Sequence, residues 1–277
     1  MSKMTRTVLF VIGVCLLGIN ISGMFLPLRH PDIYHLKPDK GVLLTEPQFY
    51  RSLPKRNTET AQTYATRLNR IVHDGIASYG NAVDKINGQI PWHENYLLFL
   101  AGYIYPQLYR PYEFCDYQKA VTRGLGICSQ QAIILTEFLR KSDIPAHIVG
   151  LSGHVVTTVQ VDPQKDIWWV LDPYYNKIIP HNLEKVETKS ELVRPYYANQ
   201  PNADALVDHY KAPGNQIYPT TKAYTGWKKY YIEKLSYIFI WIIPIICIVV
   251  AGQPYFNRWR TSLANCRQPN QTPPQQT

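Results

Sequence analysis

Acidic residues are missing from both ends of this 277-residue chain. All 20 Asp and Glu residues lie between Asp32 and Glu233, whereas six Lys and Arg residues lie outside residues 28–233. Within that central range 23 basic and 20 acidic residues nearly balance, so most of the formal charge of +9 belongs to the two ends. A charge distributed in this way does not build the basic surface that binds nucleic acid, and we expect no nucleic-acid partner.

Cysteine is scarce as well. Cys15 and Cys247 fall in apolar segments and Cys266 in the C-terminal tail, which leaves Cys115 and Cys128 in the central region. The Cys and His residues lack the paired short spacing of a zinc site, and the glycines before Cys128 lack the further glycines and the lysine of a phosphate-binding loop. The sequence therefore predicts neither a metal nor a cofactor.

Two segments contain no charged residue. Residues 8–26 are 19 mostly apolar residues, and residues 235–251 are 17 apolar residues with Pro244 near the middle. A helix needs about 20 apolar residues to cross a bilayer, and aromatic residues flank the second segment as in an interfacial belt. We predict two transmembrane helices. The alternatives are a cleaved signal peptide for the first segment and a buried core helix for the second.

Basic residues beyond both segments predict the orientation. Lys3 and Arg6 precede the first segment, and Arg258, Arg260 and Arg267 follow the second. By the positive-inside rule both termini are expected in the cytoplasm, and residues 28–233 are expected to form an extracytoplasmic domain on the plasma (inner) membrane. Residues 252–277 are expected to be a disordered cytoplasmic tail, because their last ten residues are of low complexity.

In the central domain, helices are expected to precede strands. Apolar spacing predicts helices over residues 59–78, 95–105, 116–122 and 128–141. Short β-branched and aromatic runs predict strands over residues 146–151, 154–161, 167–171 and 177–179. Residues 28–58 are expected to be a loop, and residues 182–233 to be helical turns that return to the membrane. The expected fold class is α+β, with the helix over residues 128–141 packed on a small antiparallel sheet.

Cys128, His154 and Asp172 follow one another along the chain, each at the edge of a predicted element. Cys128 opens a helix, where free N–H groups and the helix dipole stabilise a thiolate, the nucleophilic form of a thiol. His154 at the start of a strand can serve as a base, and Asp172 at the end of the next strand can orient it. Gly124 and Gly126 let the backbone turn sharply before the thiol. We predict a catalytic triad of these three residues.

The sequence pattern identifies the oxyanion donors and the cleft-lining residues around the triad less clearly. The backbone N–H of the nucleophile is one expected oxyanion donor, and Gln118 and Tyr117 are candidates for a second. Trp92, Tyr174 and Tyr175 are candidates for the lining of a substrate cleft.

The region of the triad resembles the transglutaminase-like cysteine superfamily, which has a papain-type fold. The resemblance covers about residues 92–182. It rests on Gly126-Ile127-Cys128, Ile144-Pro145-Ala146, Gly153-His154-Val155-Val156 and Trp169-Val170-Leu171-Asp172-Pro173-Tyr174. It implies that Cys128 is the nucleophile, His154 the base and Asp172 the orienting residue. His147 stands where the family commonly has Arg, and Val156 stands where it often has an aromatic residue, so the resemblance leaves the substrate open.

The expected activity is thiol acyl transfer on an amide. Hydrolysis of a peptide or envelope amide is favoured over cross-linking, because water is abundant and nothing indicates a second amine site. The expected partners are the membrane and a peptide or protein amide substrate. One alternative is an inactive module of the same fold that works in a cell-envelope or polysaccharide system. Another is a Cys115–Cys128 disulfide, which would make the region a stapled receptor or anchor domain.

Overall fold

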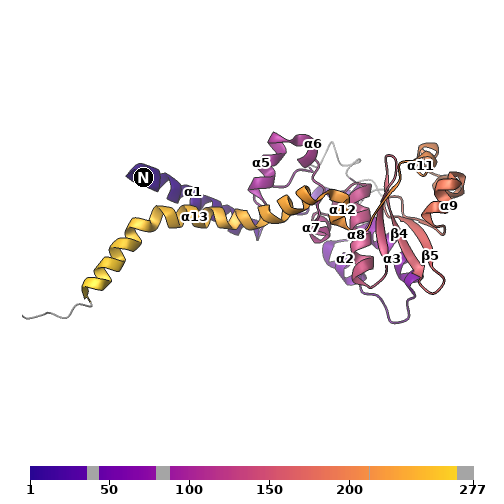
Figure 1. Cartoon of the computed structure of the whole chain (residues 1–277), viewed down its shortest axis with the longest axis horizontal. Helices are drawn as coiled ribbons and strands as arrows, with labels where there is room; N and C mark the ends of the chain where they lie inside the picture. Colours follow the sequence, from indigo (N-terminus) through magenta and orange to yellow (C-terminus); the bar gives the residue numbers. More distant parts are fainter. Residues whose placement is uncertain (36–43, 79–87, 212, 267–277) are drawn as a thin grey trace, which may run out of the picture.

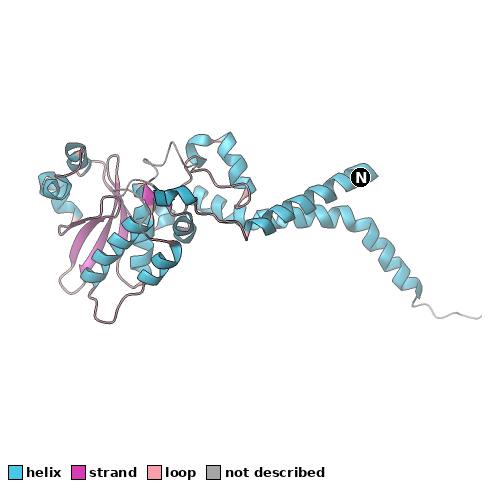
Figure 2. Cartoon of the chain, turned by 180° about the vertical axis from the view of Figure 1, so that it is seen from behind, coloured by secondary structure: helices cyan, strands magenta, loops and turns pink. Residues whose placement is uncertain are grey.

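The computed structural model describes residues 1–35, 44–78, 88–211 and 213–266. A mixed α+β domain lies at one end of two long helices, α1 (Lys3–Gly23) and α13 (Trp227–Cys266) (Figure 1). Its strands lie toward the end of the domain that is far from these helices (Figure 2). The predicted α+β class with a small antiparallel sheet is confirmed.

The four helices predicted in the domain are confirmed with small shifts of their ends. They are α3 (Ala61–Gly75), α5 (Tyr96–Ile104), α7 (Tyr117–Arg123) and α8 (Cys128–Lys141). The prediction of a loop over residues 28–58 is wrong in part, because this range contains the 3₁₀ helix η1 (Pro31–His35) and α2 (Glu46–Ser52). Thr45 and Gln48 close a capping box at the start of α2, a short-range signal that stabilises a helix of only seven residues.

Short helices form most of the later part of the domain. They are α6 (Pro106–Tyr109), α9 (Leu183–Thr188), η2 (Ser190–Val193), α10 (Arg194–Tyr197), α11 (Ala203–His209) and α12 (Thr221–Thr225). Except for α6, they correspond to the helical turns expected over residues 182–233.

The main sheet has five antiparallel strands in the order β6-β5-β4-β3-β7. Four match the predicted strands: β3 (Ala146–Gly150), β4 (Val155–Asp162), β5 (Ile167–Asp172) and β6 (Lys177–Ile179). The fifth, β7 (Gln216–Tyr218), pairs with β3 and was not predicted. A separate parallel pair, β1 (Ala77–Ser78) with β2 (Leu125–Gly126), holds the residues just before Cys128.

Both faces of the main sheet are covered, so alternate residues of β4 enter different clusters. Val159 and Val161 pack with Ile134 and Leu135 of α8, and α3 lies in the same cluster. Val156 points the other way and packs with side chains of η2, α10 and α11. The Cys-bearing helix is therefore held against β3 and β4, while the short helices cover the opposite face (Figure 1).

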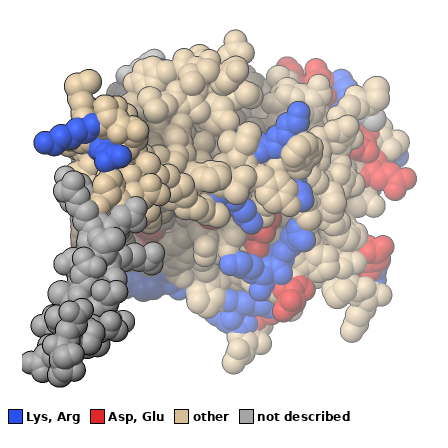
Figure 3. Space-filling view, turned by 60° about the vertical axis from the view of Figure 1, so that its left-hand side comes forward, with Lys and Arg blue, Asp and Glu red and all other residues tan. Residues whose placement is uncertain are grey.

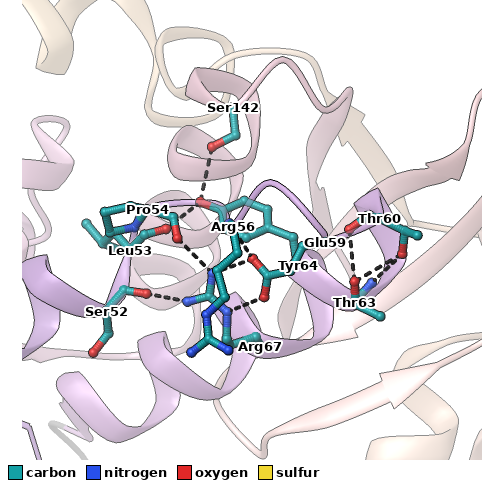
Figure 4. Close-up of polar contacts among 10 residues, drawn as sticks. All are labelled: Ser52, Leu53, Pro54, Arg56, Glu59, Thr60, Thr63, Tyr64, Arg67 and Ser142. Atoms are coloured by element: carbon teal, nitrogen blue, oxygen red, sulfur yellow. Dashed lines mark hydrogen bonds and ion pairs between the residues drawn. The ribbon is translucent and has the colours of Figure 1, made fainter.

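Arg67 anchors the chain before α3 to α3 itself (Figure 4). Its guanidinium binds the Glu59 carboxylate through two nitrogens, at 2.6 and 2.7 Å, and donates to the carbonyls of Ser52 and Pro54. Tyr64 accepts from the Ser142 hydroxyl at 3.1 Å and thereby joins α3 to the end of α8. These contacts set the position of α8 relative to the rest of the core.

The helices α1 and α13 pack along each other, and both are long and apolar enough to cross a membrane. Pro244 has no N–H, so the carbonyl of Ile240 lacks its donor within α13. The Asn20 side chain of α1 donates to this carbonyl, and the Tyr96 hydroxyl does so at 3.1 Å. At Gly13 a Cβ atom would lie 2.8–3.0 Å from atoms of α13, so glycine allows the close crossing and any larger residue must push the two helices slightly apart.

The α13 helix does not end where the apolar segment ends. It continues to Cys266, so residues 252–266 are helical and the prediction of a disordered tail is wrong for them. Residues 267–277 of that predicted tail lie outside the described residues.

The close approach at Gly13 predicts a specific cross-link. A Cβ atom at this position would lie 3.0 Å from Cβ of Cys247, so Gly13→Cys needs only a small outward shift to reach the Cβ separation of a disulfide. Mild oxidation should join the two residues, as detected by mass spectrometry of the peptides. Gly18→Cys is the control, because a Cβ atom there has no atom within 4 Å. Removal of residues 1–26 as a signal peptide would leave no such cross-link.

Candidate active site

Cys128 is the first residue of α8 and is partly exposed. The residue before it, Ile127, is the N-cap of the helix and has no side-chain hydrogen bond to it, whereas Thr60 and Asn95 cap α3 and α5 through their side chains. The first N–H groups of a helix have no acceptor in a preceding turn. At α8 they remain available beside the thiol, where they favour negative charge.

Two glycines shape the approach to this helix. Gly124 ends α7 with φ of +64°, a left-handed conformation that favours glycine, and a Cβ atom there would lie 2.4 Å from the Arg29 guanidinium. At Gly126 a Cβ atom would lie 2.6 Å from Cβ of Gln130. The turn from α7 into α8 therefore needs both glycines.

His154 lies just before β4 and is 6% exposed. Its Nε2 lies 2.8 Å from Oδ2 of Asp172, the last residue of β5. The Cys128 thiol lies close enough to the ring to contribute to the raised pKa of His154. The structure thus brings all three predicted residues together, from the start of a helix and from the facing ends of two neighbouring antiparallel strands.

Asp172 is fully buried and each of its carboxylate oxygens accepts hydrogen bonds. Oδ2 accepts from the Tyr197 hydroxyl at 2.7 Å in addition to His154. Oδ1 accepts from the backbone N–H groups of Tyr174 and Tyr175, at 3.0 and 3.2 Å. A buried carboxylate with this many donors is held in one orientation, and so is the imidazole that it binds.

The electrostatics of the pair favour charged forms of both groups. Burial by itself lowers the pKa of His154, but the charge and hydrogen bond of Asp172, together with Cys128, raise it to about 10. Burial likewise opposes the charge on Asp172, yet His154 and the donors around it lower the pKa of this carboxyl. At neutral pH the site holds an imidazolium between a carboxylate and a thiol that it can stabilise as a thiolate.

The raised pKa of His154 predicts a loss of stability at alkaline pH. Below about pH 6.5 the imidazole is protonated in both the folded and the unfolded chain, so its stabilising effect is fully present. Between 6.5 and 10 only the folded chain keeps the proton, and the free energy of unfolding should fall by up to about 1.4 kcal/mol per pH unit. Thermal unfolding of the detergent-solubilised protein across this range tests the slope. The same measurement on His154→Gln should show a flatter curve, and equal slopes would contradict the assignment.

Aromatic rings surround the imidazole. The rings of Tyr174 and Tyr175 lie 6.1 and 5.6 Å from that of His154, centre to centre, so these two predicted cleft residues do lie at the site. The Tyr174 hydroxyl is hydrogen bonded to Ser78 of β1 at 2.6 Å. His209 of α11 stacks beside His154 with ring centres 6.4 Å apart.

The other predicted neighbours do not join the site. Tyr117 packs on Phe138 and under Lys141, near the far end of α8 and about 15 Å along the helix from its first residue. Gln118 is exposed at the start of α7. Trp92 is exposed and lines a different cavity, of about 340 Å³, which residues 27–33 also line. Proximity in sequence was the basis for Tyr117 and Gln118, and packing near the far end of α8 separates Tyr117 from the thiol.

Cys115 and Cys128 are both free, so the disulfide alternative is not realised in the structure. The Cys115 thiol lies 3.3 Å from the Thr225 hydroxyl. Burial, with the negative charge of Glu233, raises the pKa of Cys115 to about 12. Of these two thiols only Cys128 is partly exposed and lies at the start of a helix beside His154.

Several residues of the site were not predicted from the sequence. Tyr197 donates to Asp172 and is bonded in turn to Tyr210 at 2.9 Å, although both lie in the polar stretch after the last predicted strand. Gln130 binds the backbone N–H and carbonyl of Phe114 and so ties the first turn of α8 to the preceding loop. The buried polar positions of the first turn of α8 were the available clue, because a core helix has little other use for them.

Comparison of the chain with models of protein families, with curated proteins and with solved structures found no match.

Proposed function

We propose that the chain is a membrane-anchored, extracytoplasmic thiol acyl-transfer enzyme of transglutaminase-like type that hydrolyses a peptide or other amide bond. The observation that carries this proposal is the line Cys128–His154–Asp172, with the thiol at an uncapped helix start and the carboxylate fully buried. Such a line is the arrangement that a nucleophile, its base and an orienting residue require. A papain-type core, with the Cys-bearing helix packed on an antiparallel sheet, is part of the same proposal.

In the proposed reaction the Cys128 thiolate attacks the amide carbonyl and a C–S bond forms. The backbone N–H groups at the start of α8 stabilise the oxyanion. His154 gives its proton to the leaving amine as the C–N bond breaks, which leaves an acyl-thioester on Cys128. A water molecule then loses a proton to His154 and attacks the thioester, releasing the acid and restoring the thiolate with the imidazolium. Asp172 and Tyr197 keep the ring in place throughout.

The proposed anchor consists of α1 and α13, with both termini in the cytoplasm. The length and apolar character of the two helices and the basic, acid-free chain ends support this topology. The packing of Gly13 and Asn20 of α1 against α13 supports a retained helix rather than a cleaved signal peptide. The domain then lies on the outer side of the plasma membrane, where an envelope peptide or amide is the accessible class of substrate.

An acylation experiment tests the function. Brief exposure of the purified full chain to p-nitrophenyl acetate should acetylate Cys128, as seen by intact mass and peptide mapping, and the adduct should decay as water releases it. Cys128→Ala should show neither the adduct nor release of free amine from a panel of acyl-peptide amides. Equal acetylation of wild type and variant would refute the enzyme, and a thiol of ordinary reactivity would point to the inactive module.

A further inference from the structure

The helices α5 and α6 present an apolar surface that the domain does not cover. Residues 95–109 contain no charged side chain, although the flanking positions are Glu94 and Arg110. Ile104 and Leu108 are 69% and 65% exposed. Leu100, Tyr103 and Tyr105 are also more than half exposed. Five large apolar side chains exposed on two adjoining short elements exceed the scattered exposure that is ordinary on a soluble surface.

This surface adjoins the two helices that can cross a membrane. Asn95 donates to Ser236 of α13 at 2.9 Å, and the Tyr96 hydroxyl donates to the Ile240 carbonyl at 3.1 Å. The end of α1 also lies against the chain just before α5, since a Cβ atom at Gly23 would lie 1.9 Å from the carbonyl oxygen of His93. Thus α5 begins at the level where α1 ends and where the apolar part of α13 begins (Figure 1).

Charged side chains are absent from the exposed surface of α5 and α6, as lipid contact requires. In the space-filling view, a broad area without Lys, Arg, Asp or Glu covers the upper middle of the face turned to the viewer (Figure 3). Glu94 turns inward and is paired with Arg123 at 3.1 Å, so it places no charge at the edge of the surface. The Arg110 guanidinium lies over the Tyr103 ring, 4.1 Å from its centre. Tyrosines and a stacked arginine are side chains suited to the boundary between lipid tails and headgroups.

We infer that α5 and α6 form an interfacial membrane element, which lies in the leaflet on the side of the domain and contacts lipid through Leu100, Ile104 and Leu108. Its occupant is the lipid bilayer, because the surface continues directly from the proposed membrane helices and residues 95–109 contain no charged side chain that could pair with a polar protein partner. Burial of apolar area in the boundary region supplies the driving force. This inference goes beyond the proposed activity and does not depend on the chemistry of Cys128.

The element would also hold the candidate site at a set height above the bilayer. The chain leaves α6 through Tyr112 and Phe114, and Phe114 is bound through its backbone to Gln130 of α8. The Tyr112 hydroxyl is bonded to Glu233 of α13 at 2.8 Å. Lipid contact at α5 and α6 is therefore connected to the helix that bears Cys128 through one short stretch of chain, in which Tyr112 and Phe114 are buried.

Photo-cross-linking tests the lipid contact in the full chain. p-Benzoylphenylalanine is introduced at Ile104, or at Leu108 as a second position, and the protein is placed in nanodiscs of phosphatidylcholine and phosphatidylglycerol without any other protein. Phe10, exposed on α1, is the positive control, and Ile217, 54% exposed on β7, is the matched apolar control far from the helices. Irradiation should give lipid adducts at Ile104, Leu108 and Phe10 and none at Ile217, as measured by mass spectrometry.

The contrary outcomes are distinct. Adducts at Phe10 but not at Ile104 or Leu108 would overturn the interfacial element and leave the membrane helices standing. Cross-links from Ile104 to a second copy of the chain in place of lipid would replace it with a dimer contact. The absence of adducts at Phe10 as well would overturn both the span and the element, while the acylation of Cys128 would still be open to its own test.

Discussion

Replacing His154 with alanine should slow the alkylation of Cys128 by iodoacetamide at pH 7 by about 100-fold, the lower end of what a positioned acid–base group contributes. The wild-type imidazole is paired with Asp172 and has a pKa of about 10, so in the proposed mechanism its positive charge stabilises the attacking thiolate. Without it the thiol keeps the N–H groups of α8 but loses the adjacent positive charge. Because the thiolate is the species that reacts, the rate reports its population.

The molecule offers two controls for this measurement. Cys115, whose pKa burial raises to about 12, should stay unlabelled in both proteins, so peptide mapping separates the two thiols. His209→Ala removes a second imidazole beside His154 that lies in ring contact with it, and should leave the rate near that of the wild type. An unchanged rate in His154→Ala, or an equal loss in His209→Ala, would show that His154 does not activate the thiol.

Replacing Arg123 with methionine should lower the free energy of unfolding by about 3–5 kcal/mol, the usual cost of leaving one partner of a buried ion pair uncompensated. The guanidinium is 7% exposed, binds the Glu94 carboxylate at 3.1 Å and donates to the Gln89 carbonyl at 3.1 Å. Without it the Glu94 carboxylate keeps the Tyr237 hydroxyl, at 2.6 Å, but no positive partner. The expected fall in melting temperature is about 10 °C in the same detergent.

Two further variants separate the buried charge from a general loss of arginine. Arg123→Met combined with Glu94→Gln removes the unpaired charge and should recover most of the stability. Arg70→Met breaks an i,i+4 ion pair with Asp74 in which the Arg70 side chain is 75% exposed. This substitution should lower the free energy of unfolding by less than about 1 kcal/mol. If the double variant is no more stable than the single one, then the cost arises from packing rather than from the Glu94 charge.

The elements around the site were predictable where the local pattern is strong. The helix Cys128–Lys141 has apolar residues at helical spacing and basic residues in its last turn, and its bounds agree with the prediction. The four strands from residue 146 to residue 179 are β-branched runs separated by turn residues, and they were located within one or two residues. The Thr45–Gln48 capping box of α2 was also readable but was overlooked.

Other elements cannot be predicted from the sequence of the segment itself. The strand Gln216–Tyr218 is three residues long and exists because it pairs with the edge of β3. Beyond residue 251, α13 continues through Pro254, where a loss of apolar character had indicated its end. The conformation of Gln216–Tyr218 therefore depends on the neighbouring strand rather than on the pattern within the segment.

The identities and order of Cys128, His154 and Asp172, the two apolar segments and the basic, acid-free chain ends are properties of the linear chain, and they sufficed to propose a triad and an anchor. Only the tertiary structure determines which of these residues contact one another. Tertiary contacts paired Asp172 with Tyr197, placed Tyr117 far from the thiol, left Cys115 and Cys128 unbonded, and set Asn20 against the carbonyl that Pro244 leaves without a donor. The physical reason is that hydrogen bonding and burial join groups far apart in sequence, and local periodicity holds no information about which of them meet.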